Sequence, residues 1–155
     1  MMFKFKLAGA AIAVSTLVPS AIAARAGELN PAAVTFKLPD QIEWKEGRIP
    51  GVQQAVMVGD PAKPGLYMVL TKWLAGNHMS RPHFHPNDRF ITVLKGTWWV
   101  GTGTTFDPSS TVPMPAGTFV THYGKQVHYD GAKDEDTVLL IVGEGPATAT
   151  PAEVK

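Results

Sequence analysis

The sequence contains no cysteine among its 155 residues. Disulfides, thiolate metal sites and cysteine nucleophiles are therefore excluded, and any metal has to be held by nitrogen and oxygen ligands. The sequence also lacks a Gly-rich phosphate loop and a Gly-x-Ser-x-Gly motif. These two absences argue against a P-loop protein and against a serine hydrolase.

Long apolar runs are scarce, and the clearest one lies at the N-terminus. Residues 7–23 are mostly apolar, follow Lys4 and Lys6, and end in small residues. This pattern predicts a signal peptide over residues 1–23, with cleavage after Ala23 or, as second choice, after Ala26. A membrane anchor is the alternative interpretation, although the run is short for one. We expect a periplasmic or secreted protein with no stable membrane anchor after cleavage.

An excess of charge of either sign is absent from the mature sequence. Removing residues 1–23 leaves 12 basic and 13 acidic residues, with no basic cluster. Nucleic acid is therefore not an expected partner. The one dense acidic run, residues 134–136, is interpreted as a solvated hairpin tip and not as a binding patch.

Helical patterns are scarce as well, since no long amphipathic helix is predicted outside the signal peptide. Short apolar or alternating runs recur between turns that contain Gly and Pro. This pattern is typical of an all-β sandwich or closed barrel. The expected strands cover residues 53–58, 66–74, 90–94, 97–102, 118–123 and 137–142, with intervening turns at 59–65, 95–96, 107–110 and 113–117.

About 130 residues remain after the signal peptide, which is enough for one domain with a hydrophobic core. We assign residues 24–51 to an extended N-terminal arm with one short edge strand at residues 34–38. Residues 52–146 form the predicted β-barrel domain, and residues 147–155 form a C-terminal tail.

Three histidines are the candidates for a metal site. Alternate residues of a strand point to the same face, so His83 and His85 place two imidazoles together, and His128 could join them from a neighbouring strand. Imidazole is the commonest protein ligand for transition metals. His78 is interpreted as a structural, hydrogen-bonded histidine.

The spacing of these residues resembles a known family. Gly76, His83, His85 and Gly96 resemble the first cupin motif, and Pro115, Gly117 and His128 resemble the second. With the turn at residues 59–65 and the ending at 143–146, the chain is similar to small, single-domain, RmlC-like cupins over residues 53–146.

The resemblance implies a single antiparallel jelly-roll barrel that holds a divalent transition metal such as Zn, Fe, Mn or Ni. The family ligands are three His and one Glu, and the three His map onto His83, His85 and His128. The Glu position, four residues after the second His, is occupied by Arg89. The fold hosts many unrelated reactions, so the resemblance implies no particular one.

Three replacements for the missing Glu stay open. Asp88 offers a carboxylate, but its strand parity is wrong unless a bulge intervenes. His122 could offer a fourth imidazole. The third option is a site of three His whose open positions take water or substrate.

Arg89 has two interpretations. If residues 83, 85 and 89 continue one alternation, the Arg89 guanidinium points into the barrel, where a divalent ion about 4 Å away would repel it by roughly 8 kcal/mol at an effective dielectric near 20. The guanidinium either reaches solvent or an acidic neighbour, or binds the carboxylate of an anionic substrate beside the metal.

The aromatic residues divide into inward and outward groups. Trp98 and Trp99 are adjacent in a predicted strand, so one faces the barrel and the other faces outward. An outward Trp would suit the contact of a homodimer. Barrel packing is expected for Tyr67, Trp73, Phe90 and Phe119, and a place at the pocket rim for Tyr123.

We therefore expect an exported, cupin-like barrel that binds a divalent metal and a small anionic organic ligand. Metal-dependent lyase, decarboxylase and dioxygenase reactions all suit this set of groups. No Asp or Glu has a predicted inward position near the histidines, which favours the alternative of a ligand-binding or sensing barrel without turnover. A metal-free isomerase that uses His85 or His128 as acid or base is the other alternative, and Arg89 favours it.

Overall fold

The computed structural model describes residues 27–154, so the predicted signal peptide lies outside the described residues. The chain divides into a first unit that ends at Phe36 and a second unit that begins at Lys37. In the first unit a turn at residues 31–33 is closed by a hydrogen bond from the Ala33 amide to the Asn30 carbonyl. Within residues 27–154, no helix has the length and hydropathy needed to cross a membrane.

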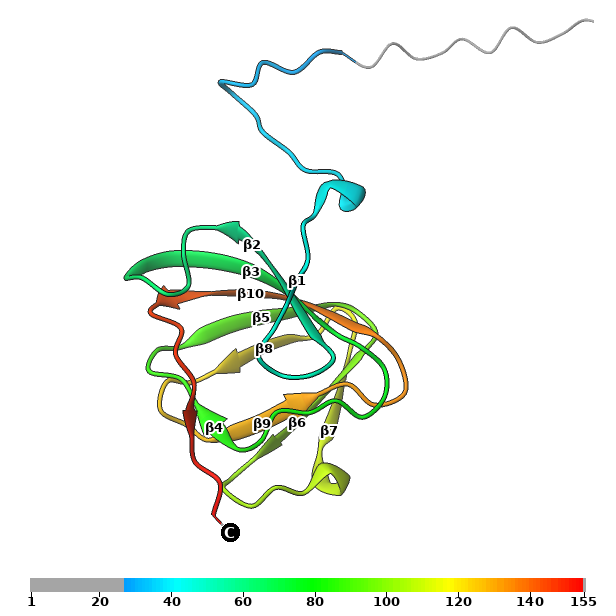
Figure 1. Cartoon of the computed structure of the whole chain (residues 1–155), viewed down its shortest axis with the longest axis vertical. Helices are drawn as coiled ribbons and strands as arrows, with labels where there is room; N and C mark the ends of the chain where they lie inside the picture. The colour runs from blue at the N-terminus through cyan, green and yellow to red at the C-terminus, as the bar shows by residue number, and fades with distance from the viewer. Residues whose placement is uncertain (1–26, 155) are drawn as a thin grey trace, which may run out of the picture. The chain divides into compact units, whose positions relative to one another are not determined.

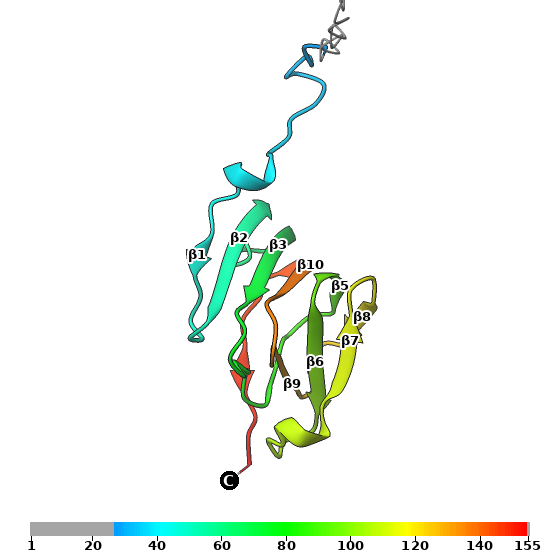
Figure 2. The same cartoon turned by 90° about the vertical axis from the view of Figure 1, so that its right-hand side faces the viewer.

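The second unit is a pair of antiparallel sheets that face each other (Figures 1 and 2). The sheet that we call the scaffold sheet has the spatial order β1 (Lys45–Glu46), β2 (Val52–Val58), β3 (Gly65–Trp73), β10 (Thr137–Gly145), β5 (Arg89–Lys95) and β8 (Phe119–His122). The sheet that we call the ligand sheet has the order β11 (Thr150–Pro151), β4 (His83–Phe84), β9 (His128–Gly131), β6 (Thr97–Thr102) and β7 (Val112–Pro115). Two 3-10 turns, η1 (Pro39–Gln41) and η2 (Pro108–Ser110), are the helical elements that the described residues contain.

The scaffold sheet forms because its strands alternate between apolar inward residues and mixed outward ones. β3 and β10 pair over nine residues each, and every second side chain along them is buried. Their inward residues pack against the inner face of the ligand sheet, because apolar surface is stabilised when both faces exclude water. The core consists of Val52, Tyr67, Val69, Trp73, Ile91, Val93, Trp98, Val100, Ala132, Leu139 and Ile141.

The six predicted strands are all present, and the additional ones are short. β4, β9 and β11 have two to four residues each, which is too short for an alternating pattern to stand out in the sequence. β7 includes Pro113 and Pro115, although the sequence predicts a turn over residues 113–117. That prediction is wrong because β7 is an edge strand, where a residue without an N–H group is tolerated.

Three other expectations are corrected. No strand forms at residues 34–38, and the short edge strand is β1. Residues 134–136 connect β9 of one sheet to β10 of the other, so they are not the tip of a hairpin. Phe90 and Phe119 are 46% and 64% exposed and stack on each other, with ring centroids 6.4 Å apart, on the outer face of the scaffold sheet. They therefore do not pack inside the barrel.

The sheets extend beyond residues 52–146. β1 adds an edge strand to the scaffold sheet, and β11 adds one to the ligand sheet by pairing with β4. The predicted C-terminal tail therefore takes part in the sheet, and Figure 1 shows it running from the end of β10 past β4.

Candidate metal centre and cavity

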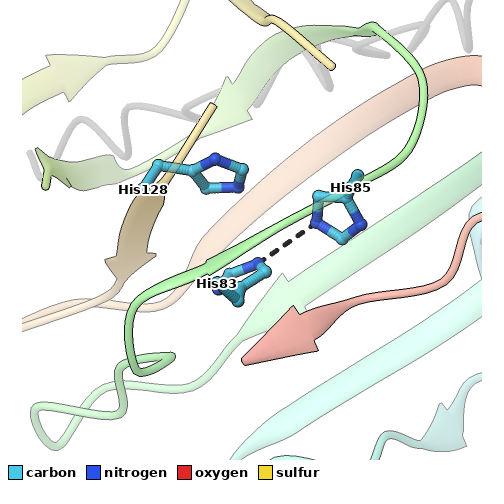
Figure 3. A group of neighbouring side chains, drawn as sticks. All are labelled: His83, His85 and His128. Carbon is cyan, nitrogen blue, oxygen red and sulfur yellow. Dashed lines mark hydrogen bonds between the residues drawn. The ribbon is translucent and has the colours of Figure 1, made fainter. Parts of the chain in front are cut away.

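The structure brings His83, His85 and His128 together on the inner face of the ligand sheet (Figure 3). His83 of β4 and His128 of β9 are directly paired across the two strands, and His85 follows His83 on the same face. The ring centroids of His85 and His128 lie 4.9 Å and 4.6 Å from that of His83. His78 is not part of this group.

Each of the three imidazoles has its Nδ1 atom hydrogen-bonded to a backbone carbonyl. His83 Nδ1 is 2.8 Å from the Arg81 oxygen, His85 Nδ1 is 2.8 Å from the Thr148 oxygen, and His128 Nδ1 is 3.1 Å from the Gln126 oxygen. A carbonyl can only accept, so each Nδ1 carries the proton and donates it. In a neutral ring the lone pair is then on Nε2, the atom that faces the other two rings.

This arrangement fits a metal ion. The Nε2 atoms of His83 and His85 are 3.1 Å apart, yet two neutral rings with protonated Nδ1 atoms offer two acceptors and no donor between them. The Nε2 atom of His128 is buried and has no hydrogen-bond partner. Two nitrogens that each lie about 2.1 Å from one ion are at most about 4.2 Å apart, so the first pair already has a suitable spacing. Carbonyl acceptors on Nδ1 are also the usual orienting partners of metal-bound histidines.

Burial keeps the buried rings neutral. Burial, with smaller contributions from the neighbouring Arg89 and His83, lowers the pKa of His85 to about 3. Burial also lowers the pKa of His128 to about 4, although the Asp130 carboxylate opposes the shift. Neutral imidazole is the form that ligates metals, so both rings are ready to bind at neutral pH.

A row of four residues crosses the scaffold sheet, and two of them, Tyr67 and Arg89, line the same cavity. Tyr67 of β3, Gly143 of β10, Arg89 of β5 and His122 of β8 are successive partners across the sheet. A Cβ atom on Gly143 would lie 2.7 Å from the Tyr67 hydroxyl, so the missing side chain leaves the room that this hydroxyl occupies. The Tyr67 hydroxyl is therefore next to Arg89, whose charge counteracts the rise that burial causes in the pKa of Tyr67.

Arg89 lies inside the barrel, where strand parity places it. It lines the cavity with His83 and His85. One terminal nitrogen of its guanidinium donates to His122 Nδ1 at 3.2 Å, and its Nε atom is buried without a partner. Burial lowers the pKa of Arg89, and the charges of Asp130 and Tyr67 oppose this shift. An anion that accepted a hydrogen bond from Nε would complete the environment of this cation.

The two candidates for a fourth ligand, His122 and Asp88, each make a hydrogen bond of their own. His122 accepts from Arg89 through Nδ1, so in its neutral form the proton is on Nε2, which leaves no lone pair for a metal. His122 also belongs to a second group of potential metal ligands, with Asp130 and with His128, which the two groups share. Asp88 accepts a hydrogen bond from the Gly124 amide at 2.7 Å, in a contact that is exposed, so it fixes a turn outside the cavity.

The cavity between the two sheets has a volume of about 410 Å³. Trp98 lies in its lining and is buried, whereas Trp99 is partly exposed beneath the Lys133 ammonium, so the predicted inward and outward division of this pair is confirmed. Tyr123 is exposed and is not part of the cavity lining, so its predicted place at the rim is wrong.

The comparisons with known proteins identify the fold. The sequence matches no family model and no curated protein. Its structure is similar to the polyketide cyclase RemF from Streptomyces resistomycificus, with a TM-score of 0.61 and 15% identity over 79% of this chain and 87% of RemF. It is also similar to KdgF from Halomonas sp., with a TM-score of 0.55 and 18% identity over 72% of this chain and 95% of KdgF. A cupin-2 domain protein from Rhodospirillum rubrum matches with a TM-score of 0.56 and 17% identity over 79% of this chain and 80% of the other. The chain has the cupin fold.

The carboxylate beside the histidines is not at the position of the motif Glu, which Arg89 occupies, but at Asp130. Asp130 is 4% exposed, lines the cavity and places one carboxylate oxygen 3.9 Å from His128 Nε2. The Ser80 hydroxyl lies within hydrogen-bond distance of Asp130, 3.1 Å from its backbone oxygen and 3.4 Å from a carboxylate oxygen. The expectation that no acidic residue points inward near the histidines is therefore wrong. Asp130 stands two residues after His128, so the strand alternation that joined His83 to His85 could have found it.

Proposed function

We propose that this cupin binds one divalent transition metal through His83, His85 and His128 and holds a small anionic organic ligand in the cavity beside it. The observation that carries the proposal is the contact of the His83 and His85 Nε2 atoms at 3.1 Å, with both Nδ1 atoms committed to carbonyls. A cation between the rings removes the conflict between the two lone pairs. Zinc, iron, manganese and nickel all accept imidazole ligands.

The charges that line the cavity favour an anionic ligand. Arg48 and Arg89 are the lining cations, and Asp130 is the lining carboxylate that the structure describes. A divalent ion would add two positive charges to this nearly balanced set. The ligand would accept hydrogen bonds from the guanidinium of the half-buried Arg89 at one end, while its apolar part packs against Trp98 and Leu139.

The presence of Asp130 in the cavity favours an enzymatic function over ligand binding without turnover. The metal would supply Lewis acidity toward a carboxylate or carbonyl, or a site for oxygen activation, which suits lyase, decarboxylase and dioxygenase reactions. Asp130 adds a carboxylate in the cavity that can accept or donate a proton beside His128. A metal-free isomerase is less favoured, because burial lowers the pKa of His85 to about 3 and makes it a weak base.

The proposal also includes export of the protein and formation of a homodimer. Export of the mature chain to the periplasm or beyond is supported by the apolar N-terminal run that follows Lys4 and Lys6. A homodimer is supported by the stacked, exposed Phe90 and Phe119. The elution volume and light scattering of the purified mature chain would test the second part.

Elemental analysis of the mature protein, produced with added metal salts, tests the metal site. We expect about one transition-metal ion per chain in the wild type and a loss of most of it in His83→Ala. The matched control is His78→Ala, because His78 lies outside the group of three. A wild type that stays metal-free after such loading would overturn the proposal.

Calorimetric titration of the metal-loaded protein with a panel of small carboxylic acids tests the ligand class. We expect binding in the wild type and at least tenfold weaker binding in Arg89→Met, which corresponds to about 1.4 kcal/mol. Binding of neutral analogues with the same affinity as acids would contradict the anionic class. Measuring product formation with any acid that binds would then separate an enzyme from a binding protein.

A further inference from the structure

We propose that the C-terminal segment, residues 147–154, is a positioning element for the metal site and not a passive tail. The inference rests on the proposed metal function of His83, His85 and His128. It concerns a part of the chain that the cupin motifs do not include, since they end before residue 147.

The segment supplies the hydrogen bond that orients His85. The Thr148 carbonyl accepts from His85 Nδ1 at 2.8 Å, whereas the acceptors of His83 and His128 are carbonyls two residues before them in the chain. His85 is thus the one member of the group whose tautomer depends on a distant part of the chain. Losing such an outer partner typically weakens metal binding by about 10 to 100-fold.

The segment also builds the strand that carries His83. β4 has only two residues, and its register with β9 includes a single pair, His83 with His128. Its register with β11 includes two pairs, Pro151 with His83 and Thr150 with Phe84. The position of His83 therefore depends on the segment at least as much as on the neighbouring strand of the barrel.

Anchors along its length hold the segment in place. The Ala147 amide donates to Pro61, the Ala152 amide donates to Pro82, and the Val154 amide donates to Thr104. Glu153 accepts from Nε and a terminal nitrogen of Arg81, which forms a two-point ion pair. The Arg81 guanidinium also lies over the Phe106 ring at 3.9 Å from its centroid.

The segment forms one wall of the cavity as well. Residues 147–149 line it, and two of the three are alanines. The carbonyl that orients His85 and the wall next to the ligand are thus parts of the same three residues. Removing the segment should therefore open the cavity and, at the same time, remove the hydrogen bond that orients His85.

Cobalt(II) binding to the mature chain and to a chain that ends at Ala147 tests the proposal. We expect the shortened chain to bind Co²⁺ about 10 to 100-fold more weakly. We also expect its visible d–d spectrum to change in shape at saturation, because a freed His85 alters the ligand geometry. Circular dichroism without metal establishes that the shortened chain is folded. A folded, shortened chain with unchanged affinity and spectrum would overturn the proposal.

A substitution keeps the test decisive if the shortened chain does not fold. Glu153→Gln removes the ion pair with Arg81 while leaving the segment in place, and we expect Co²⁺ binding to weaken by about two- to fivefold. Glu135→Gln is the matched control, because Glu135 is an exposed carboxylate that accepts from Thr97 and lies outside the segment. Equal Co²⁺ affinities of the two variants would contradict the inference.

Carboxypeptidase digestion gives a reciprocal measurement. Coupling between two sites acts in both directions, so bound Co²⁺ should stabilise the docked segment and slow the removal of residues 148–155 from the mature chain by a metal-free serine carboxypeptidase. A chain that binds Co²⁺ but is digested at the same rate with and without it would overturn the inference alone. A chain that binds no Co²⁺ would overturn the proposed metal site and the inference with it.

Discussion

The two sheets that face each other across the cavity are built for different tasks. The scaffold sheet has two nine-residue strands with regular alternation, and its inward face supplies much of the apolar core. The ligand sheet positions the three histidines and Asp130 on or beside strands of two to four residues, and all four residues of β9 are buried. Burial of alternating apolar residues thus stabilises the scaffold sheet, whereas hydrogen bonds to individual side chains orient the histidines of the ligand sheet.

The two faces also differ in charge. The scaffold sheet carries the cation Arg89 with its partners Tyr67 and His122, and the ligand sheet carries three imidazoles and a carboxylate. The cavity lies between a wall with the Arg89 cation and a wall with the proposed metal ligands. This difference predicts that substitutions on the two sheets will separate stability, metal affinity and anion affinity.

Acid should have the largest effect, and it should act through the histidines. The folded protein holds the pKa of His85 at about 3 and that of His128 at about 4, and it lowers the pKa of His122, against 6.5 for each when exposed. Between about pH 6.5 and 4 the unfolded chain therefore binds more protons than the folded one, so stability falls as pH falls. Each ring contributes up to about 1.4 kcal/mol per pH unit to this slope.

Urea unfolding of the metal-free protein at a series of pH values between 7 and 4 measures the slope. His128→Leu should reduce it by about a third, because one of the three buried rings is gone. Saturating Zn²⁺ should raise stability at pH 7, since an ion that binds only the folded chain stabilises it. Equal stability of the metal-free protein at pH 7 and pH 5 would contradict the neutral, buried state of these rings.

One substitution in each sheet should separate stability from metal affinity. Ile91 of β5 is fully buried, and Ile91→Ala should cost about 2–5 kcal/mol of unfolding free energy while metal affinity stays unchanged. His128→Leu should abolish metal binding, yet at pH 7 it should cost the metal-free fold only about 1 kcal/mol, because His128 loses its Nδ1 hydrogen bond to Gln126 while its Nε2 atom has no partner to lose. Urea unfolding and Co²⁺ titration of both variants measure the contrast. Metal loss in Ile91→Ala would show that the two sheets do not act separately.

The same contrast explains what the sequence could and could not predict. The long strands of the scaffold sheet were predicted because alternation repeats over them, and the His83, His85 and His128 group followed from parity and motif spacing. Asp130 was missed although its parity is the same as that of His128. The row formed by Tyr67, Gly143 and Arg89 depends on the register between β3, β10 and β5, which no local pattern specifies. The role of Thr148 could not be predicted, because a backbone carbonyl leaves no signal in the choice of residue.

Two substitutions of Arg89 test the charge difference between the sheets. Arg89→Met removes the cation, and we expect at least about tenfold tighter Zn²⁺ binding, because the repulsion between two cations disappears. Arg89→Glu adds the carboxylate of the cupin motif and should bind Zn²⁺ more tightly still, because the new side chain offers the ion a fourth ligand. Competition with a chromophoric chelator measures both affinities. Unchanged affinity in both variants would show that the guanidinium lies too far from the ion to repel it.

The outer face of the scaffold sheet should be the least sensitive region. Phe119→Ser removes an aromatic ring that is 64% exposed and loses its stacking on Phe90, so the expected cost is at most about 1 kcal/mol of unfolding free energy in a monomer. Val93→Ser on the neighbouring strand is the matched control, because Val93 is 1% exposed and its loss should cost several times more. Urea unfolding at two protein concentrations distinguishes the cases. If Phe119→Ser cost as much as Val93→Ser, and only at the higher concentration, the outer face would be buried between two copies of the chain. The two faces of the scaffold sheet would then both be apolar interfaces, one inside the barrel and one between barrels.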